Sequence, residues 1–334
     1  MAWLDLPTIW AFILAFGVLA YVVLDGFDLG IGILFPFFDK GTERNIAMNS
    51  VAPVWDGNET WLVLGGGGLL AAFPLAYSIV MPAVYAPIIA MLLALVFRGV
   101  AFEFRWRHPG HEGFWDFAFI GGSIVAALAQ GITLGAILQG ITVSGRQYAG
   151  GWWEWLSPFT LLTGVSLVIG YALLGATWLI MKTEGEVQDH AFRLARLAGI
   201  GVILCLALVS AATPFLEHAY YERWFAWPNV LFTAQVPLLV AICAFVLLRS
   251  LAAGAERLPF LMLLALFLLC FIGLGISIFP YAVPRSVTIW AAAAPPRSQS
   301  FMLAGAVFII PIILAYTGWA YWVFRGKVGT HGYH

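Results

Sequence analysis

Four acidic residues and one arginine fall within or beside strongly apolar segments in the first third of the chain. Asp25 and Asp28 lie three positions apart in LDGFDLG, which places both on one face of a helix. Asp56 and Glu59 have the same spacing in WDGNET, and Arg98 follows in a third apolar segment. One arginine could neutralise part of this group, while the remaining carboxyls, desolvated and repelling one another, would tend to hold protons. These residue types therefore indicate proton handling in a low-dielectric environment.

A structural role is the alternative for both acidic pairs. Asp56 followed three residues later by Glu59 resembles a capping box at the start of a helix. Asp25 and Asp28 could equally mark the end of a short first span. The apolar residues 51–55 that precede Asp56 argue for a position below the membrane interface. We therefore favour a functional site over simple helix capping.

The composition requires the helices that carry these residues to lie in a membrane. Hydrophobic residues make up 62% of the 334 residues and charged residues 10%, against about 25% charged in a typical soluble domain. The net charge of −1 provides no basic field for nucleic acid. The chain is therefore predicted to be an all-α integral membrane protein, with residues 1–334 in a single transmembrane domain. The first apolar run is expected to stay as a span and not to be removed as a signal peptide.

Nine apolar segments are long enough to cross a hydrocarbon core of ~30 Å. They cover residues 7–35, 53–73, 78–100, 114–141, 158–181, 194–213, 229–249, 259–279 and 300–324. The glycines at 65–68 read as helix-packing residues, as do those at 26, 30, 32, 131, 135 and 140. Spans four to nine are expected to contain no charge in their interiors.

Lysine and arginine are distributed unequally between the two sides of these spans. Twelve lie in or beside the odd-numbered loops and the C-terminal end, and four lie in the even-numbered loops. By the positive-inside rule the richer side faces the cytoplasm, so the N-terminus is predicted outside and the C-terminus inside. The charged residues of the first three spans then fall in the cytoplasmic half of the membrane.

No residue pattern predicts a metal or haem site in this chain. A b-type haem inside the membrane normally needs a histidine from within a span. All six histidines are expected in loops or at the C-terminal end: His108, His111, His190, His218, His331 and His334. The pair His108 and His111 is more typical of a solvated pair than of a metal site. The three cysteines lie singly in apolar runs, without metal-ligand spacing.

Two long segments resemble motifs of subunit II of the cytochrome bd family of bacterial quinol oxidases. They are LDGFDLGIG at 24–32 and WDGNETWLVLGGGGLLAAFP at 55–74, supported by FRGVAFEFR at 97–105 and QGITLGAILQG at 130–140. The length and the span pattern agree over the whole chain. The short C-terminal ending and the segment 291–296 resemble the cyanide-insensitive branch of the family.

The resemblance implies a non-haem subunit of a terminal oxidase that oxidises quinol and reduces dioxygen to water in the bacterial inner membrane. Its partner, subunit I, would carry haems b and d, while this chain alone would bind no cofactor, although family members can hold a structural quinone. The resemblance leaves open whether a small single-helix accessory subunit joins this heterodimer. The implied fold is two four-helix bundles with a peripheral first helix.

The same resemblance implies roles for individual residues, none of them catalytic in this chain. Asp56, in the WDGN motif, is implied as a residue of the path that takes up protons from the cytoplasm. Trp55 and Arg98 would flank this path or a bound quinone. The complete set of carboxyl residues assigned to the path is Asp25, Asp28, Asp56 and Glu59.

A proton-coupled secondary transporter would also require buried carboxylates and is the alternative function. Transporters commonly have related halves with broken helices at the membrane midplane. Here the charges are confined to three adjacent spans, and the second half has no matching set. A purely structural partner also stays open, because carboxylates that bind a partner and carboxylates that conduct protons are the same residue types.

The predicted orientation is tested by a fusion placed after Lys327. With the C-terminus in the cytoplasm, an alkaline phosphatase fused there should be inactive and a fluorescent protein fused there should glow. An active phosphatase with a dark fluorescent fusion would contradict both the span count and the charge argument.

Overall fold

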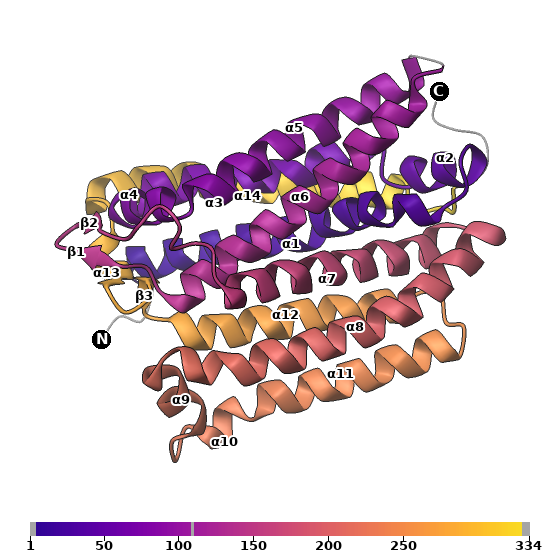
Figure 1. Cartoon of the computed structure of the whole chain (residues 1–334). Coiled ribbons are helices and arrows are strands. Elements are labelled where there is room, and N and C mark those ends of the chain that lie inside the picture. The colour runs from indigo at the N-terminus through magenta and orange to yellow at the C-terminus, as the bar shows by residue number, and fades with distance from the viewer. Residues whose placement is uncertain (1–4, 108–109, 329–334) are drawn as a thin grey trace.

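The computed structural model describes residues 5–107 and 110–328, so His108, His331 and His334 lie outside the described residues. The described chain is almost entirely helical, and its long helices run side by side along one direction (Figure 1). Within these described ranges, eight helices are long and apolar enough to cross a membrane. An all-α membrane protein is therefore confirmed in outline.

Each of these eight helices spans at least 21 residues, counted together with any short helical turn that directly adjoins it. They are α1 (Leu6–Leu34), α5 (Tyr85–Arg107), α6 (Glu112–Gln139), α7 (Pro158–Lys182), α8 (Glu186–Leu216), α10 with α11 (Val230–Thr233 and Gln235–Ala252), α12 (Leu258–Ile278) and α14 (Pro296–Val323). The remaining elements are α2 (Thr42–Asn49), α3 (Trp55–Ala72), α4 (Pro74–Ala83), α9 (His218–Phe225), α13 (Ile289–Ala292), the hairpin β1 (Val143–Ser144) with β2 (Gln147–Tyr148), and the hairpin β3 (Tyr281–Val283) with β4 (Val287–Thr288).

Polar residues begin two of the long helices. Asp5 precedes α1 and accepts a hydrogen bond from the backbone N–H of Thr8 at 3.0 Å. Hydrogen bonds from Thr8 lower the pKa of Asp5, which keeps a negative charge at the positive end of the helix. Ser157 and Thr160 form a reciprocal capping box at the start of α7. Each cap satisfies backbone donors that have no partner within the helix.

The second and third expected spans differ from the observed helices. The segment 53–73 forms α3, whose 18 residues would extend about 27 Å but which is not among the eight apolar helices. The segment 78–100 is divided, because α4 ends at Ala83 and α5 begins only at Tyr85. Pro82 and Pro87 flank this break and remove backbone donors there. Since α5 continues to Arg107, Arg98 lies inside a helix, and its expected position at the end of a span is wrong.

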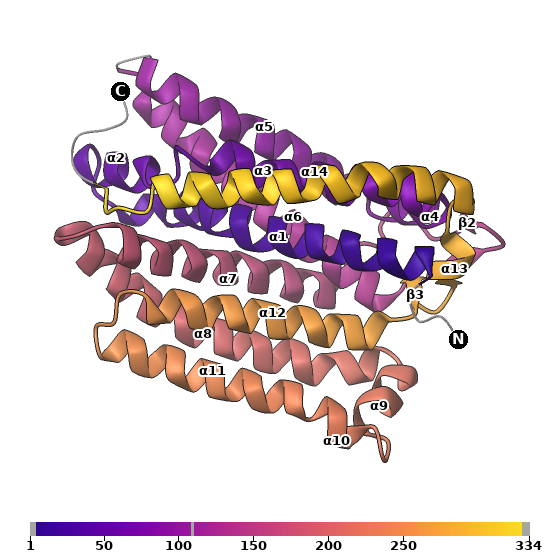
Figure 2. The ribbon, with the colours of Figure 1, turned by 180° about the vertical axis from the view of Figure 1, so that it is seen from behind.

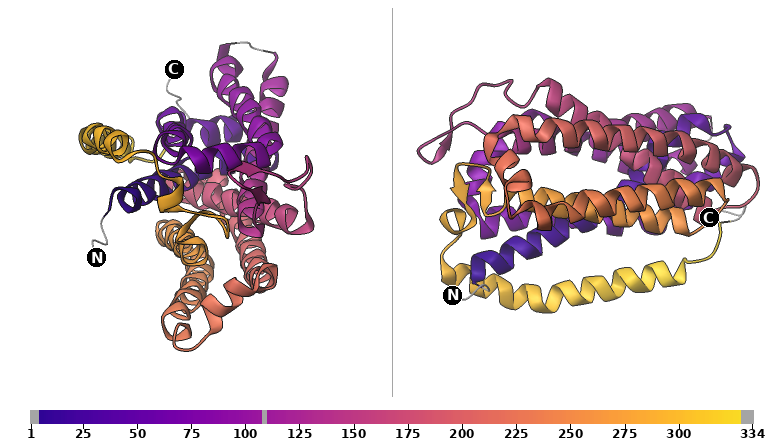
Figure 3. Two further views of the ribbon diagram at one scale, coloured as in Figure 1. Left: turned by 90° about the vertical axis from the view of Figure 1, so that its left-hand side faces the viewer. Right: turned by 90° about the horizontal axis from the view of Figure 1, so that it is seen from below.

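The first helix is central, so its expected peripheral position is wrong. α1 packs along α3, α6 and α7 (Figures 1 and 2), and its residues Asp25–Leu34 are all buried. The peripheral helix is α14, which runs along the outside of the molecule beside α1 (Figure 3, right). Within α14, all of which is described, Gln299 is the one buried residue. The remaining long helices pack as α5 on α6, α6 on α7, α7 on α8 and α12, and α11 on α8 and α12.

Glycines allow the closest helix contacts. A Cβ atom on Gly30 would lie 1.8 Å from the carbonyl oxygen of Tyr171, and one on Gly131 would lie 2.5 Å from the carbonyl oxygen of Thr163. The predicted packing role is confirmed at these positions. Gly140 differs, because it follows the last residue of α6 with a φ of 92°. It faces the side chain of Arg285, in the loop between β3 and β4.

The two ends of the helix array differ in their charge. The N-terminal and C-terminal ends of the described chain lie at opposite ends of the array (Figure 1). The end with α2 carries the basic residues Lys40, Arg105, Arg107, Lys182, Arg257 and Lys327. The other end, with both hairpins, α9 and the start of α14, carries Arg146, Arg223, Arg285 and Arg297. The charge difference is thus present in three dimensions, and the orientation relative to the membrane stays a prediction.

The contact between α1 and α7 is tested by Gly30→Ala. The added methyl group meets backbone atoms of α7, which cannot move aside alone, so we expect a loss of about 1–3 kcal/mol in the free energy of unfolding. The measurement is the thermal midpoint of the purified protein in detergent. Gly275→Ala in α12 is the matched control, because no atom lies within 4 Å of its added Cβ. Equal midpoints for the two variants would contradict the close contact.

Candidate functional site

Arg98 lies at the centre of a charged cluster formed by α1, α3 and α5. Its side chain is fully buried, and its Nη1 lies 2.7 Å from Oδ1 of Asp25. Oε2 of Glu59 lies 3.8 Å from Nη1, and Oδ2 of Asp28 lies 3.9 Å from Nη2. The side chains of Asp25 and Asp28 have no exposed area, whereas that of Glu59 is 28% exposed. We refer to these four residues as the charged cluster.

The charged cluster has more acidic than basic groups. If Asp25, Asp28 and Glu59 were all ionised, three negative charges would face the single positive charge of Arg98. Burying an unbalanced charge is costly, so the cluster favours holding at least one proton. Oδ2 of Asp25 and Oδ1 of Asp28 make no hydrogen bond within the described part of the chain. These two oxygens are therefore buried acceptors without a hydrogen-bond donor in the described chain.

Asn58 is hydrogen-bonded to the charged cluster, a contact that the sequence did not predict. Its Nδ2 donates to Oδ2 of Asp28 at 2.8 Å and to the carbonyl oxygen of Leu24 at 3.3 Å. Its Oδ1 accepts from the hydroxyl of Tyr321, on α14, at 2.8 Å. The one signal in the sequence was the position of Asn58 between Asp56 and Glu59 in the WDGNET motif. The contact with Tyr321 could not be predicted from spacing, because the two residues lie 263 positions apart.

A line of uncharged polar groups extends from the cluster toward α7. Tyr21 lies one helical turn before Asp25 on α1 and so shares its face. The Nε2 of Gln130, on α6, donates to the hydroxyl of Tyr21 at 2.8 Å, and the hydroxyl of Tyr171, on α7, donates to Oε1 of Gln130 at 2.7 Å. The polar site therefore connects α1, α3, α5, α6, α7 and α14.

Asp56 lies beside the charged cluster and not in it. It is exposed in the first turn of α3, where Glu59 follows one turn later. The alternative interpretation of this pair as a capping box is wrong, because α3 begins after Val54, which has no side-chain acceptor. Asp25 and Asp28 do not mark the end of a span either, since α1 continues to Leu34.

Trp55 packs against an aromatic ring, that of Phe102, beside the charged cluster. Its ring stacks on Phe102, with ring centroids 4.7 Å apart and an interplanar angle of 3°. The guanidinium carbon of Arg98 lies 5.9 Å from the centroid of the same Phe102 ring. Trp55 itself is only partly buried, at the start of α3.

A second buried ion-pair group lies near the start of α6. Asp116 in α6 accepts from Nη1 of Arg44 and from Nε of Arg105, both at 2.6 Å. Arg105 also donates to the side-chain oxygen of Asn45 at 2.7 Å. The carboxylate of Asp116 is thus fully paired, and the group ties α2 to α5 and α6. We read it as structural, in contrast to the charged cluster.

The described histidines stand apart from the cluster. His111 is the residue before α6, and His218 begins α9. His190 lies in α8, not in a loop as expected, with its Nδ1 3.0 Å from Oε1 of Glu43. Among the residues that the structure describes, no group of three or more His, Cys, Asp or Glu side chains could hold a metal ion.

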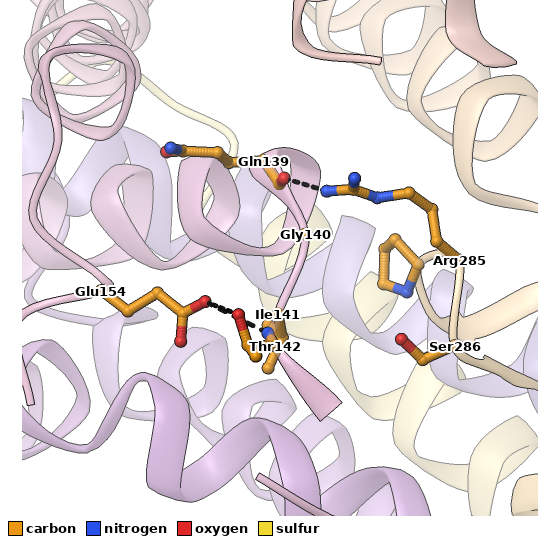
Figure 4. A pocket seen from close by; sticks show the side chains of 8 residues that line it. Gln139, Gly140, Ile141, Thr142, Glu154, Arg285 and Ser286 are labelled. Carbon is orange, nitrogen blue, oxygen red and sulfur yellow. Dashed lines mark hydrogen bonds between the residues drawn. The ribbon is translucent and has the colours of Figure 1, made fainter. Parts of the chain in front are cut away.

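A cavity of about 330 Å³ lies at the end of the molecule that contains the hairpins (Figure 4). Thr142, Glu154 and Ser286 line it, together with Arg285 and the end of α6. Arg285 donates to the carbonyl oxygen of Gln139, and Glu154 accepts from the hydroxyl of Thr142 at 2.5 Å. These hydrogen bonds join the end of α6 and the residues after it to the two loop segments that line the cavity.

Comparison with known proteins agrees over nearly the whole chain. Residues 6–324 match the model of the family described as cytochrome bd terminal oxidase subunit II. The chain is 32% identical to cytochrome bd-I ubiquinol oxidase subunit 2 of Escherichia coli (strain K12), across 96% of this chain and 94% of that protein. It is 27% identical to cytochrome bd ubiquinol oxidase subunit 2 of Bacillus subtilis (strain 168), across 97% of each. The structure of bd oxidase from Geobacillus thermodenitrificans has a similar fold, with a TM-score of 0.73, 17% identity, and coverage of 97% of this chain and 100% of that chain.

The charge balance of the cluster is tested by removing Arg98. Arg98→Met leaves buried carboxyls without their cation, and we expect a loss of about 3–5 kcal/mol in the free energy of unfolding. Adding Asp25→Asn should recover part of this loss, because the carboxylate nearest to Arg98 is then neutral.

Arg107→Met is the matched control on the same helix, since its pair with Glu103 is solvent-exposed and should contribute little. The measurement is thermal unfolding of four purified proteins: the unmodified protein, Arg98→Met, the double variant and Arg107→Met. A double variant no more stable than Arg98→Met would contradict the proposed charge pairing.

Proposed function

The chain belongs to the cytochrome bd terminal oxidase subunit II family, and on this premise we propose that it is the haem-free partner of a haem-bearing subunit I and carries part of the proton-uptake path. Membership makes it a multi-pass protein of the bacterial inner membrane and a subunit of a terminal quinol oxidase. It also favours the oxidase over the proton-coupled transporter.

The proposed fold assigns the long helices to one transmembrane domain. It consists of two four-helix bundles, α1, α3, α5 and α6, and α7, α8, α11 and α12, with α14 outside them. Counting α3, the chain then crosses the membrane nine times, with its N-terminus outside and its C-terminus in the cytoplasm. The packing contacts and the position of basic residues support this arrangement.

The proposed absence of haem from this chain is supported by the chemistry of its side chains. An intramembrane haem is usually held by histidine, with histidine or methionine opposite. The described histidines lie near helix starts, and His190 is engaged with Glu43. We therefore assign the haems b and d, the oxidation of quinol and the reduction of dioxygen to subunit I. This chain would stabilise that subunit and supply protons to it.

One observation carries the proposed proton role: the charged cluster reaches the surface of the described chain through Glu59. Glu59 is partly exposed, yet its carboxylate lies 3.8 Å from the fully buried Arg98. Asp56 is exposed one turn earlier on the same helix. Because reduction of dioxygen to water consumes a proton for every electron, such a connection between surface and interior has a use in this enzyme.

The proposed path begins at Asp56, continues to Glu59 and enters the cluster at Asp25 and Asp28. Arg98 keeps part of the cluster ionised, and the excess carboxyl binds and releases the proton. Trp55, partly buried beside the path, is the proposed contact for a structural quinone. Arg98 has no exposed area and would act on such a quinone only through its neighbours.

Asp56→Asn tests the entry of the path. Asparagine keeps the size and the hydrogen-bonding capacity of the side chain but cannot release a proton at accessible pH. We expect normal assembly and haem content of the complex and at least about tenfold slower quinol-driven oxygen consumption. Asp56→Glu should retain more activity, because it keeps a titratable group.

Glu103→Gln is the control for this experiment. Glu103 is an exposed carboxylate paired with Arg107, away from the charged cluster, so its turnover should match the unmodified complex. Unchanged turnover in Asp56→Asn would remove Asp56 from the path. Loss of assembly in that variant would show a structural role instead.

A further inference from the structure

The polar contacts that α14 makes within the described chain gather at its two ends. At its start, Nε2 of Gln299 donates to the carbonyl oxygen of Ala72 at 3.1 Å, and the indole N–H of Trp10 donates to the carbonyl oxygen of Gln299 at 3.1 Å. At its end, Tyr321 donates to Asn58. Between these ends the apolar side chains of Phe308 and Ile312 are exposed. The position of the last turn is therefore determined by a few specific contacts.

Lys182, the last residue of α7, holds the chain that follows α14. Its ammonium group donates to the carbonyl oxygens of Phe324 and Gly326, the latter at 2.8 Å. The same ammonium group lies 5.4 Å from the centroid of the Trp178 ring. A cation at the carbonyl end of a helix is favourable for both the hydrogen bonds and the helix dipole. The end of α14 is thus fastened to α7.

The ring of Tyr321 is fixed between α1 and α7. Its centroid lies 6.1 Å from that of Trp178 at an interplanar angle of 88°, and 6.4 Å from that of Phe27 at 79°. Both are edge-to-face contacts of the kind that aromatic rings favour. They direct the hydroxyl of Tyr321 toward Asn58 on α3.

The partners of Asn58 determine how its amide is oriented. Its Nδ2 faces a carbonyl oxygen and the Oδ2 of Asp28, and both are acceptors. Its Oδ1 faces the hydroxyl of Tyr321, which can donate. A flipped amide would place its oxygen against two oxygens. The carbonyl oxygen of Leu24 and Oδ2 of Asp28 therefore select the orientation in which Asn58 donates to Asp28, and the hydroxyl of Tyr321 donates to the Oδ1 atom that this orientation presents.

We propose that Tyr321 is a positioning residue for the proton path: by donating to Oδ1 of Asn58, it holds the amide against Oδ2 of Asp28, so that an arriving proton is directed to Oδ1 of Asp28. Oδ1 has no hydrogen-bond partner within the described chain, so it accepts the proton without breaking a contact. This inference rests on the proposed proton role of the charged cluster. The other titratable or charged groups that act on Asp28 come from three helices: Asp25 on α1, Glu59 on α3 and Arg98 on α5.

The test is Tyr321→Phe in the complete oxidase complex, with Tyr316→Phe as the matched control. Tyr316 is on the same helix and its side chain is 68% exposed. Oxygen consumption is measured against pH and quinol concentration, with haem content as the check on assembly. For Tyr321→Phe we expect the pH profile of kcat to move by about half a pH unit, the effect of one hydrogen bond, with the KM for quinol unchanged. The control should keep the original profile.

A double-mutant cycle with Asn58→Ala shows whether Tyr321 acts through Asn58. In the Asn58→Ala background, Tyr321→Phe should add no further shift, because its partner is already absent. A full, additive shift there would overturn the proposal, as would a Tyr321→Phe profile identical to that of the control. Tyr321→His, whose ring N–H can still donate, should restore part of the original profile.

Two outcomes separate this inference from the proposed function. If Asp56→Asn slows turnover while Tyr321→Phe behaves like the control, this inference alone fails. If the carboxyl variants turn over at the unmodified rate, the proton role fails, and the inference that depends on it is overturned as well. If both Tyr321→Phe and Tyr321→His prevent assembly, Tyr321 is structural and the positioning role is wrong.

Discussion

Burial of the Arg98 guanidinium among apolar helices is the constraint on which the rest of the structure depends. A cation without exposed area is tolerated in such surroundings only when carboxylates lie close to it. Those carboxylates come from two other helices, α1 and α3, so the charge pairing also fixes how three helices pack. The same pairing leaves an excess of acid. An excess carboxyl next to a fixed cation is what a proton-binding site requires.

The close contacts of α1 provide the environment in which this pairing is strong. Where Gly30 meets the backbone of α7, no side chain or lipid can lie between the two helices. Electrostatic interactions are stronger in such a low-dielectric interior than in water. The buried end of α1, which carries Asp25 and Asp28, therefore needs both its glycines and its central position. A peripheral first helix could not hold two carboxyls in this way.

The sequence predicted those features that depend on residues close together in the chain. Apolar segments of sufficient length identified most of the long helices, and the spacing of Asp25 and Asp28 placed both on one face. Spacing could not distinguish Glu59, which faces Arg98, from Asp56, which is exposed, because residues three positions apart are expected on the same face of a helix. The break before α5 was missed because an apolar run looks continuous in hydropathy even where prolines interrupt it.

Contacts between distant segments account for what the sequence could not show. Tyr321 and Asn58 are separated by 263 positions, so no spacing in the sequence predicts the hydrogen bond between them. Asp116 lies near the start of α6, and only the fold brings Arg44 and Arg105 to it. The central position of α1 likewise results from packing against α6 and α7 and has no local signature.

The central claim is that the charged cluster holds an exchangeable proton at neutral pH. Infrared spectroscopy of the purified complex tests it directly, because a protonated carboxyl has a C=O stretching band that an ionised carboxylate lacks. The account predicts such a band at neutral pH, a shift of the band when H2O is exchanged for D2O, and its change or loss in Glu59→Gln and Asp28→Asn but not in Glu103→Gln. A spectrum in which none of the three cluster variants Asp25→Asn, Asp28→Asn and Glu59→Gln alters a protonated-carboxyl band would contradict the account.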